Sequence, residues 1–143
     1  MTVARAEVGN WLDGYRMAWQ QQDADLVTAL FSADARYAVN PFDHVLNGRA
    51  AIEEYWSAGA AGSQTDIVFD YELWAVDGNT ATAHWTASFT RTRTGERVHM
   101  DGVFRLAFAR DESRGLICKS LDEWWFLSSD AAGPGGVDTP RTD

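Results

Sequence analysis

The sequence predicts an α+β fold in which a strongly curved antiparallel sheet wraps around three N-terminal helices. Apolar residues recur at helical spacing in the first part of the chain, and from Asp66 onward they alternate with polar residues at a period of two. Turn signals at 77–79, 94–95 and 111–115 divide the second part into four long strands. Because twist accumulates along strands of this length, we expect the sheet to curve and to bury one face against the helices.

Length, composition and charge indicate a single domain and exclude several classes of partner. The chain has 143 residues and a formal net charge of −9, without a basic stripe, which argues against nucleic acid and membranes as partners. Cys118 is the only cysteine, so we expect neither an intrachain disulfide nor a thiolate metal cluster. This suits a cytoplasmic protein, and no signal-peptide or membrane-spanning pattern is found. We expect residues 1–128 to form the domain and 129–143 a flexible tail.

The helical part of the chain carries one stripe rich in aromatic residues. This stripe includes Tyr15 and Trp19, and a tyrosine buried on it needs a partner for its hydroxyl. The expected boundaries are residues 4–22 for the first helix, an N-cap at Asp23 or Asp25 for the second, and Asn47 or Gly48 to Gly59 or Gly62 for the third. Between the second and third helices, residues 35–39 are β-prone, and residues 40–47 are expected to be a loop at the rim of the fold that carries Asn40 and His44.

The last strand, at 118–127, carries the most informative acidic residue. By alternation, Leu121, Glu123 and Trp125 share one face, and the bulky Trp124 and Phe126 lie on the other, which indicates a central strand. A carboxyl group among apolar neighbours is costly to ionise, so its pKa is expected to rise. Glu123 is therefore either a paired structural acid or a general acid/base, and both interpretations stay open.

Other polar and aromatic residues have less specific interpretations. Trp19, Trp56, Trp85 and Trp125 come from apolar faces of different elements, and they either fill the core or line a cavity. His84, His99 and Asp101 lie at strand spacing on a face expected to be polar, a weak signal for a metal site, so we expect no bound metal.

Four segments carry a family resemblance: GYRMAWQQQDADLVTALFSADARY at 14–37, NGRAAIEEYW at 47–56, GERVHMDGVFRLAF at 95–108 and LDEWWF at 121–126. They are similar to the nuclear transport factor 2-like superfamily, in its SnoaL-like and ketosteroid-isomerase-like branch, over roughly residues 8–127. The resemblance implies a cone-shaped fold with a deep apolar pocket and homodimers formed through the sheet. The superfamily hosts many unrelated activities, so fold alone does not give function.

The resemblance also implies roles for single residues. Tyr15 falls at the position of the isomerase tyrosine that donates to the oxyanion. Asn40 stands before Pro41, where the isomerase has its carboxylate base, and asparagine cannot take a proton. Asp101 lies near the isomerase's second oxyanion donor, but strand alternation turns it inward only if a bulge occurs at Gly102. Glu123 falls where the epoxide hydrolases of this superfamily carry a pocket aspartate.

The leading functional hypothesis is a cofactor-independent acid/base enzyme of the isomerase, cyclase, dehydratase or epoxide hydrolase type. Its ligand would be a small apolar molecule that is polyketide-, terpene- or steroid-like. Tyr15 would donate a hydrogen bond, Glu123 would transfer the proton, and Asn40 and Asp101 would orient the substrate. The substrate-binding residues would be Trp19, His44, Trp56, Trp85, Phe104 and Trp125. The rival hypothesis is a non-catalytic ligand-binding or dimerisation module in which Glu123 is structurally satisfied.

Overall fold

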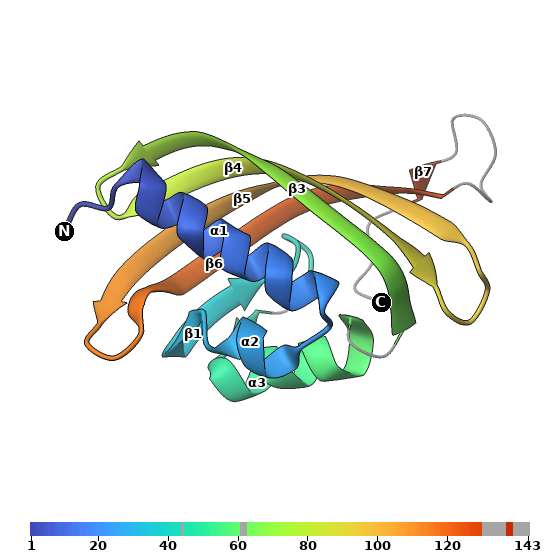
Figure 1. Cartoon of the computed structure of the whole chain (residues 1–143), viewed down its shortest axis with the longest axis horizontal. Coiled ribbons are helices and arrows are strands. Elements are labelled where there is room, and N and C mark those ends of the chain that lie inside the picture. Colours follow the sequence, from blue (N-terminus) through green and yellow to red (C-terminus); the bar gives the residue numbers. More distant parts are fainter. Residues whose placement is uncertain (44, 61–62, 130–136, 139–143) are drawn as a thin grey trace.

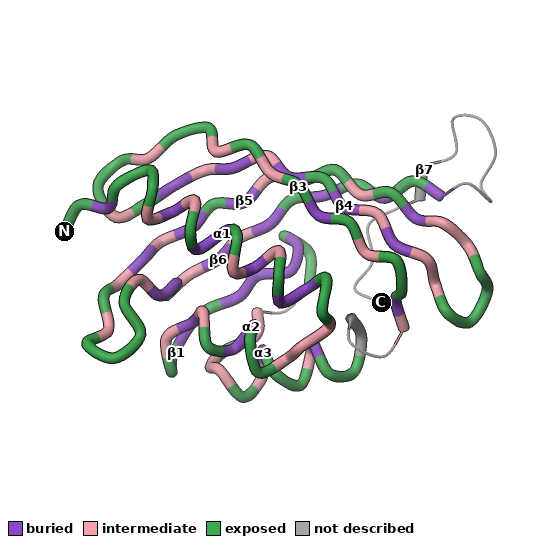
Figure 2. The backbone as a smooth tube through the Cα atoms, viewed as in Figure 1, coloured by how far each residue is buried: buried purple, intermediate pink, exposed green. Residues whose placement is uncertain are grey.

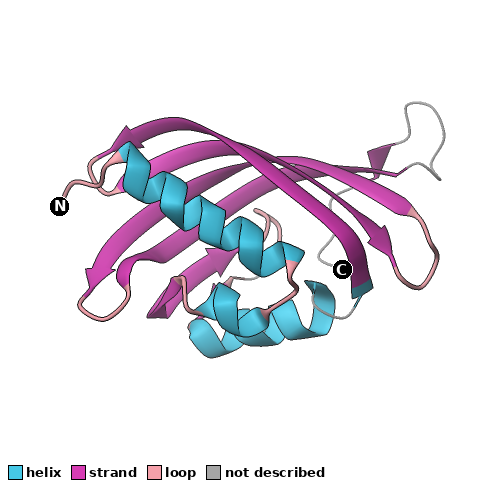
Figure 3. Cartoon of the chain, in the orientation of Figure 1, coloured by secondary structure: helices cyan, strands magenta, loops and turns pink. Residues whose placement is uncertain are grey.

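The structure is a computed structural model of the chain and describes residues 1–43, 45–60, 63–129 and 137–138. Helices come first and long strands follow (Figure 1, Figure 3). The helices are α1 (Arg5–Gln20), α2 (Ala24–Thr28) and α3 (Arg49–Tyr55), which continues into a π-helical turn, η1 (Trp56–Ala60). The strands are β1 (Phe31–Ala38), β2 (Leu46–Asn47), β3 (Gln64–Asp77), β4 (Thr80–Arg91), β5 (Arg97–Asp111), β6 (Gly115–Ser129) and β7 (Val137–Asp138).

The strands form one curved sheet that arches over the helices, as Figure 1 shows, and the predicted fold class is confirmed. The strand order is β2-β1-β6-β5-β4-β3, and β7 pairs with β6. Strands β3 to β6 form the predicted antiparallel meander. Strand β1 adds a feature that the sequence pattern did not indicate, because it pairs in parallel with β6. The sheet is therefore mixed, and β6 lies between β1 and β5.

The predicted alternation places the aromatic side chains on the face of the sheet that the helices cover. Residues at this face are mostly buried, whereas their strand neighbours are intermediate or exposed (Figure 2). The largest fully buried side chains include Tyr15, Tyr37, Phe69, Trp85 and Phe104. None of the described helices has the length and apolar character needed to cross a membrane.

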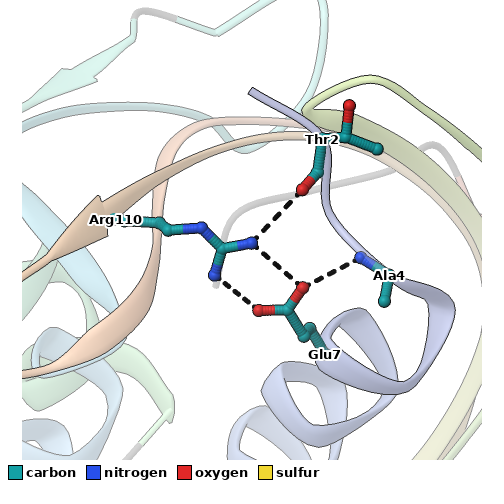
Figure 4. Close-up of polar contacts among 4 residues, drawn as sticks. All are labelled: Thr2, Ala4, Glu7 and Arg110. Atoms are coloured by element: carbon teal, nitrogen blue, oxygen red, sulfur yellow. Dashed lines mark hydrogen bonds and ion pairs between the residues drawn. The ribbon is translucent and has the colours of Figure 1, made fainter.

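Charged and polar contacts fix the ends of the helices. Asp23 caps α2, since its side chain accepts hydrogen bonds from the backbone N–H groups of Asp25 and Leu26. At the start of α1, Glu7 accepts a hydrogen bond from the backbone N–H of Ala4 and forms a two-point ion pair with Arg110 of β5 (Figure 4). The Arg110 guanidinium lowers the pKa of Glu7 to about 2. This contact anchors α1, the helix that carries Tyr15, to the sheet.

Gly102 in the middle of β5 makes room for the indole of Trp85. The two residues are directly paired across β4 and β5, and a Cβ atom at Gly102 would lie 2.5 Å from Cζ2 of Trp85 and 2.8 Å from the backbone oxygen of Trp124. The pairing of β4 with β5 continues through this position without a register shift. Asp101, next in the chain, therefore stays on the outer face, opposite to Phe104.

Replacing Gly102 with alanine should destabilise the protein by about 1–3 kcal/mol, because the added methyl group must displace Trp85 or the β6 backbone. The measurement is the free energy of unfolding in urea. The matched control is Gly9→Ala in α1, where the new Cβ would make an ordinary contact of 3.7 Å with Tyr71 and should stabilise the helix slightly. If Gly102→Ala and Gly9→Ala had the same free energy of unfolding, this would contradict the close contact at Gly102.

Candidate functional site

A chain of three buried polar groups connects α1, β1 and β6. The hydroxyls of Tyr15 and Tyr37 lie 3.1 Å apart and share a hydrogen bond, and the Tyr37 hydroxyl donates to Oε2 of Glu123 over 3.5 Å. Tyr15 comes from the stripe of α1, whereas Tyr37 is brought to β6 by the parallel pairing of β1, which sets Tyr37 opposite Leu121. The structure thus brings the predicted Tyr15 and Glu123 into one network, with Tyr37 between them.

Tyr37 is the site residue that the sequence analysis did not single out. The only signal in the sequence is its place in the short β-prone run before Asn40 and Pro41. Its partner Glu123 lies 86 residues further along the chain, so the contact depends on which strand β1 joins. Strand alternation within one segment cannot supply that information.

The carboxyl group of Glu123 is held in its neutral form. The residue is 7 % exposed and is paired across the sheet with Phe104. Burial raises the pKa of Glu123 to about 8, and the hydrogen bond from Tyr37 offsets this only in part. Glu123 is therefore protonated at neutral pH and can donate that proton to another molecule.

The two tyrosines also remain protonated at neutral pH. Burial, followed by the nearby Glu123 carboxyl, raises the pKa of both Tyr15 and Tyr37 well above the usual value of 10. Each hydroxyl is then a permanent hydrogen-bond donor. The arrangement is a relay of neutral donors that can stabilise negative charge on Glu123 when its proton leaves.

A small pocket lies at the rim of the sheet, where β1 ends beside β6. The pocket has a volume of about 240 Å³. It is lined by Arg36, Ala38, Asn40, Pro41, Asp43, Val45, Asp122, Glu123 and Trp124. The lining mixes apolar groups with charged ones, and strand alternation places Asp122 and Trp124 on the face of β6 opposite to the Glu123 carboxyl.

Asn40 shapes the rim of this pocket through its own loop. Its Oδ1 atom accepts hydrogen bonds from the backbone N–H groups of Phe42 and Asp43, and its Nδ2 atom donates to the Asp43 carboxylate. Both the oxygen and the nitrogen of the Asn40 side-chain amide are therefore already hydrogen-bonded within this turn. The predicted orienting role of Asn40 would therefore require it to leave these contacts, whereas its observed contacts fix the loop. His44, the other predicted rim residue, lies outside the described residues.

An ion-pair group lies beside the rim pocket on the outer face of β6. Asp122 lies 2.7 Å from Arg36 of β1 and 3.5 Å from Arg105 of β5. Its side chain is 13 % exposed, so the two guanidinium groups compensate a largely desolvated carboxylate. Asp122 and Glu123 are neighbours with opposite environments, because alternation turns one toward arginines and the other toward aromatic rings.

Three of the four predicted tryptophans, Trp19, Trp56 and Trp85, pack into a continuous aromatic layer beside the Tyr15–Tyr37–Glu123 chain. Trp19 contacts Trp56 and Trp85 at ring-centroid distances of 5.7 and 6.1 Å, and Tyr15 contacts Phe104 at 5.3 Å. Trp125 donates its indole N–H to the backbone oxygen of Val39 over 2.7 Å, which holds the end of β1 against β6. The layer surrounds Tyr15 with rings and so separates its hydroxyl from bulk water.

Asp101 lies apart from this network, which corrects the prediction of a role beside Tyr15. Its side chain is 68 % exposed on the outer face of β5 and contacts Nε2 of His84 at 2.8 Å. The bulge that would have turned it inward does not occur, because the ladder is continuous at Gly102. No group of three or more metal-binding side chains comes together within the part of the chain that the structure describes.

Comparison with known families identifies a match over most of the chain. The profile described as "SnoaL-like domain" matches residues 12–117. This range includes Tyr15, Tyr37 and the aromatic layer, and it ends before Glu123. No curated protein sequence matches the chain significantly.

Several solved structures share the fold at low sequence identity. A hexachlorocyclohexane dehydrochlorinase (LinA) type 2 is 8% identical, with a TM-score of 0.73, over 95% of this chain and 93% of that chain. The epoxide hydrolase/cyclase-like enzyme SalBIII, linked to pyran ring formation in salinomycin, is 19% identical, with a TM-score of 0.68, over 84% and 91%. A nuclear transport factor 2-like superfamily protein from Salmonella enterica is 16% identical, with a TM-score of 0.69, over 83% and 88%. These similarities support the fold alone.

The raised pKa of Glu123 should make the protein less stable as pH rises. In the unfolded chain this carboxyl ionises near 4.5, whereas in the folded protein it keeps its proton up to about 8. The folded state thus binds more protons between these values, so its stability falls across this window, by at most a few kcal/mol. Glu123→Gln should remove this contribution.

The measurement is the difference in unfolding free energy between the wild type and Glu123→Gln at several pH values. Subtraction cancels the other titrating groups. We expect the wild type to lose unfolding free energy relative to Glu123→Gln as the pH rises from about 5 to about 8. A difference that stays constant over this range would show that Glu123 is ionised in the folded protein.

Proposed function

The chain belongs to the family of SnoaL-like domains, and within that family we propose that it binds a small, largely apolar organic molecule and transfers a proton to or from it without a cofactor. The observation that carries this proposal is the buried Glu123 carboxyl, whose pKa is raised to about 8 and which Tyr37 and Tyr15 join in one hydrogen-bonded chain. Because the pKa of Glu123 is about 8, the same group can release a proton and take one back near neutral pH.

In the proposed reaction, Glu123 acts as general acid and then as general base. Its carboxyl O–H donates a proton to a carbonyl, hydroxyl or epoxide oxygen of the ligand, which leaves a carboxylate on Glu123. Tyr37 stabilises this carboxylate by donating its hydroxyl to Oε2, and Tyr15 positions Tyr37 from behind. The carboxylate then regains a proton from the ligand or from water. Tyr15 acts here through Tyr37, so it is a positioning residue.

Relatives with the same fold support this class of chemistry. One is named as a dehydrochlorinase and another as an epoxide hydrolase/cyclase-like enzyme. Elimination, epoxide opening and ring closure all require a proton to move on a small organic molecule. At these levels of identity the names support only the general type of reaction.

A second candidate function is non-catalytic binding of the same kind of ligand. The packing of Trp19, Trp56 and Trp85 around Tyr15 supports it, because these rings occupy much of the helix-covered side of the sheet. In this alternative Glu123 would be a buried structural acid whose hydrogen-bonding requirement Tyr37 meets. A bound ligand would dissociate without being chemically converted.

The two candidates predict different results for Glu123→Gln. A thermal-shift screen of cyclic ketones, enones and epoxides would supply a ligand, and product analysis would show whether it is converted. If Glu123 is the general acid, Glu123→Gln should lower kcat by at least about 100-fold while the protein stays folded. Asp101→Asn on the outer face is the matched control and should keep full turnover. Ligands that stabilise the protein and are never converted would favour the binding module.

We also propose that the outer face of the sheet pairs with a second copy of the chain. Val68, Trp74, Trp124 and Phe126 are large apolar residues exposed on this face. Beside Val68 and Phe126 lies a trough of about 470 Å³. Exposed apolar area gathered on one face of a sheet is typical of an interface.

Light scattering at several protein concentrations should show a dimer that Phe126→Asp dissociates, because the substitution places a charge in the middle of the apolar face. Phe42→Asp is the matched control, since Phe42 is 95% exposed on the rim loop. This control should leave the dimer intact. A wild-type protein that stays monomeric at every concentration would contradict the proposed interface.

A further inference from the structure

The parallel pairing of β1 with β6 is short, and it sets the distance between Tyr37 and Glu123. The register shifts after Phe31, and regular pairing resumes only at Arg36 and continues to Ala38. Because the contact between Tyr37 and Glu123 crosses these two strands, a small slide of β1 along β6 would change it. The distance of 3.5 Å is already long for a hydrogen bond between two oxygen atoms, so little movement is needed to break it.

An ion pair on the outer face of the sheet joins the same two segments. Nη1 of Arg36 donates to Oδ1 of Asp122 over 2.7 Å. Since side chains alternate along a strand, this ion pair lies on the face opposite to the contact between Tyr37 and Glu123. Both contacts join residues that are 86 positions apart in the chain. They therefore hold β1 and β6 in the same register, one from each face of the sheet.

The outer contact is the stronger of the two. It joins charged groups at 2.7 Å, whereas the inner contact joins neutral groups at 3.5 Å, and charge-assisted hydrogen bonds are about twice as strong as neutral ones. Asp122 is only 13 % exposed, and Arg105 of β5 lies 3.5 Å from its other carboxylate oxygen. The carboxylate is thus also held from β5, and water screens its attraction to Arg36 less than on the open surface.

We infer that Arg36 and Asp122 are positioning residues for the proposed reaction. Their ion pair fixes the register of β1 on β6, and this register holds the hydroxyl of Tyr37 against Glu123 on the inner face. The inference rests on the proposed function, in which Tyr37 stabilises the carboxylate that forms when Glu123 gives up its proton. Both positioning residues act through the backbone of their strands, because their side chains lie on the opposite face of the sheet.

Two other contacts also hold this part of the chain. The indole of Trp125 donates to the Val39 oxygen over 2.7 Å. The hydroxyl of Tyr15 lies 3.1 Å from that of Tyr37. If these contacts suffice, loss of the ion pair leaves Tyr37 in place. The ionisation of Glu123 distinguishes the two cases, because the hydrogen bond from Tyr37 lowers the pKa of this carboxyl.

The test is Asp122→Ala, which removes the ion pair, with the ¹³C titration midpoint of the Glu123 carboxyl as the readout. If the ion pair positions Tyr37, the midpoint should rise from its wild-type value near 8, because the hydrogen bond from Tyr37 is lost. The expected rise is about 0.5–1 pH unit. Removal of a negative charge beside Glu123 has the opposite effect through space, since it favours ionisation and lowers the midpoint.

Asp101→Ala is the matched control. Asp101 is also a carboxylate on the outer face, and its side chain contacts His84 of β4. This control should leave the midpoint of Glu123 unchanged. Arg36→Lys keeps a cation opposite Asp122 and should keep the wild-type midpoint, whereas Arg36→Met should raise it.

The same substitutions in a Tyr37→Phe background complete the test. Neither Asp122→Ala nor Arg36→Met should lift the midpoint there as it does in the wild type, because the hydrogen bond is already missing. This comparison needs only one of the two variants to fold. An equal rise in both backgrounds, or a midpoint that falls or stays constant in Asp122→Ala, would overturn the inference and leave the proposed function intact. A wild-type midpoint near 4.5 would contradict the proposed function itself.

Discussion

The burial of the Glu123 carboxyl is the constraint on which the candidate site depends. Strand β6 lies between β1 and β5, and its helix-facing side chains point into the aromatic core. An ionised carboxylate in this position would be strongly destabilised, so the group keeps its proton. The hydroxyl of Tyr37 is the polar partner that makes this burial tolerable, and Tyr15 in turn holds Tyr37.

The rest of the architecture supports this arrangement from two sides. The ion pair of Glu7 with Arg110 anchors α1 to the sheet and so fixes the height of Tyr15 above it. On the other side, the indole of Trp125 holds the end of β1 through the Val39 oxygen, two residues after Tyr37. At pH values above the pKa of Glu123 in the unfolded chain, keeping this carboxyl neutral lowers the free energy of unfolding. A group that destabilises the folded protein in this way is typical of a functional site.

The sequence alone predicts the fold well and the site in part. Period-two alternation and turn residues are local signals, so the meander and the inward face of Glu123 could be predicted, and alternation also places Asp101 outward. The residue missed, Tyr37, depends on the parallel pairing of β1 with β6, a contact between distant segments. The bulge at Gly102 that would have turned Asp101 inward does not occur, because the glycine makes space for Trp85 and the ladder stays continuous. Local sequence patterns predict on which face of a strand a side chain lies. They do not predict which residues of other strands lie beside it, because this depends on the order in which the strands pair.

The protonation state of Glu123 tests this central claim most directly. A ¹³C NMR titration of its side-chain carboxyl, assigned by comparison with Glu123→Gln, would follow the ionisation of this one group. We expect a midpoint near 8, and a higher one in Tyr37→Phe, because the hydrogen bond from Tyr37 lowers the pKa. A midpoint near the ordinary value of 4.5 would show that Glu123 is a charged, solvated carboxylate and would contradict both the buried relay and the proposed chemistry.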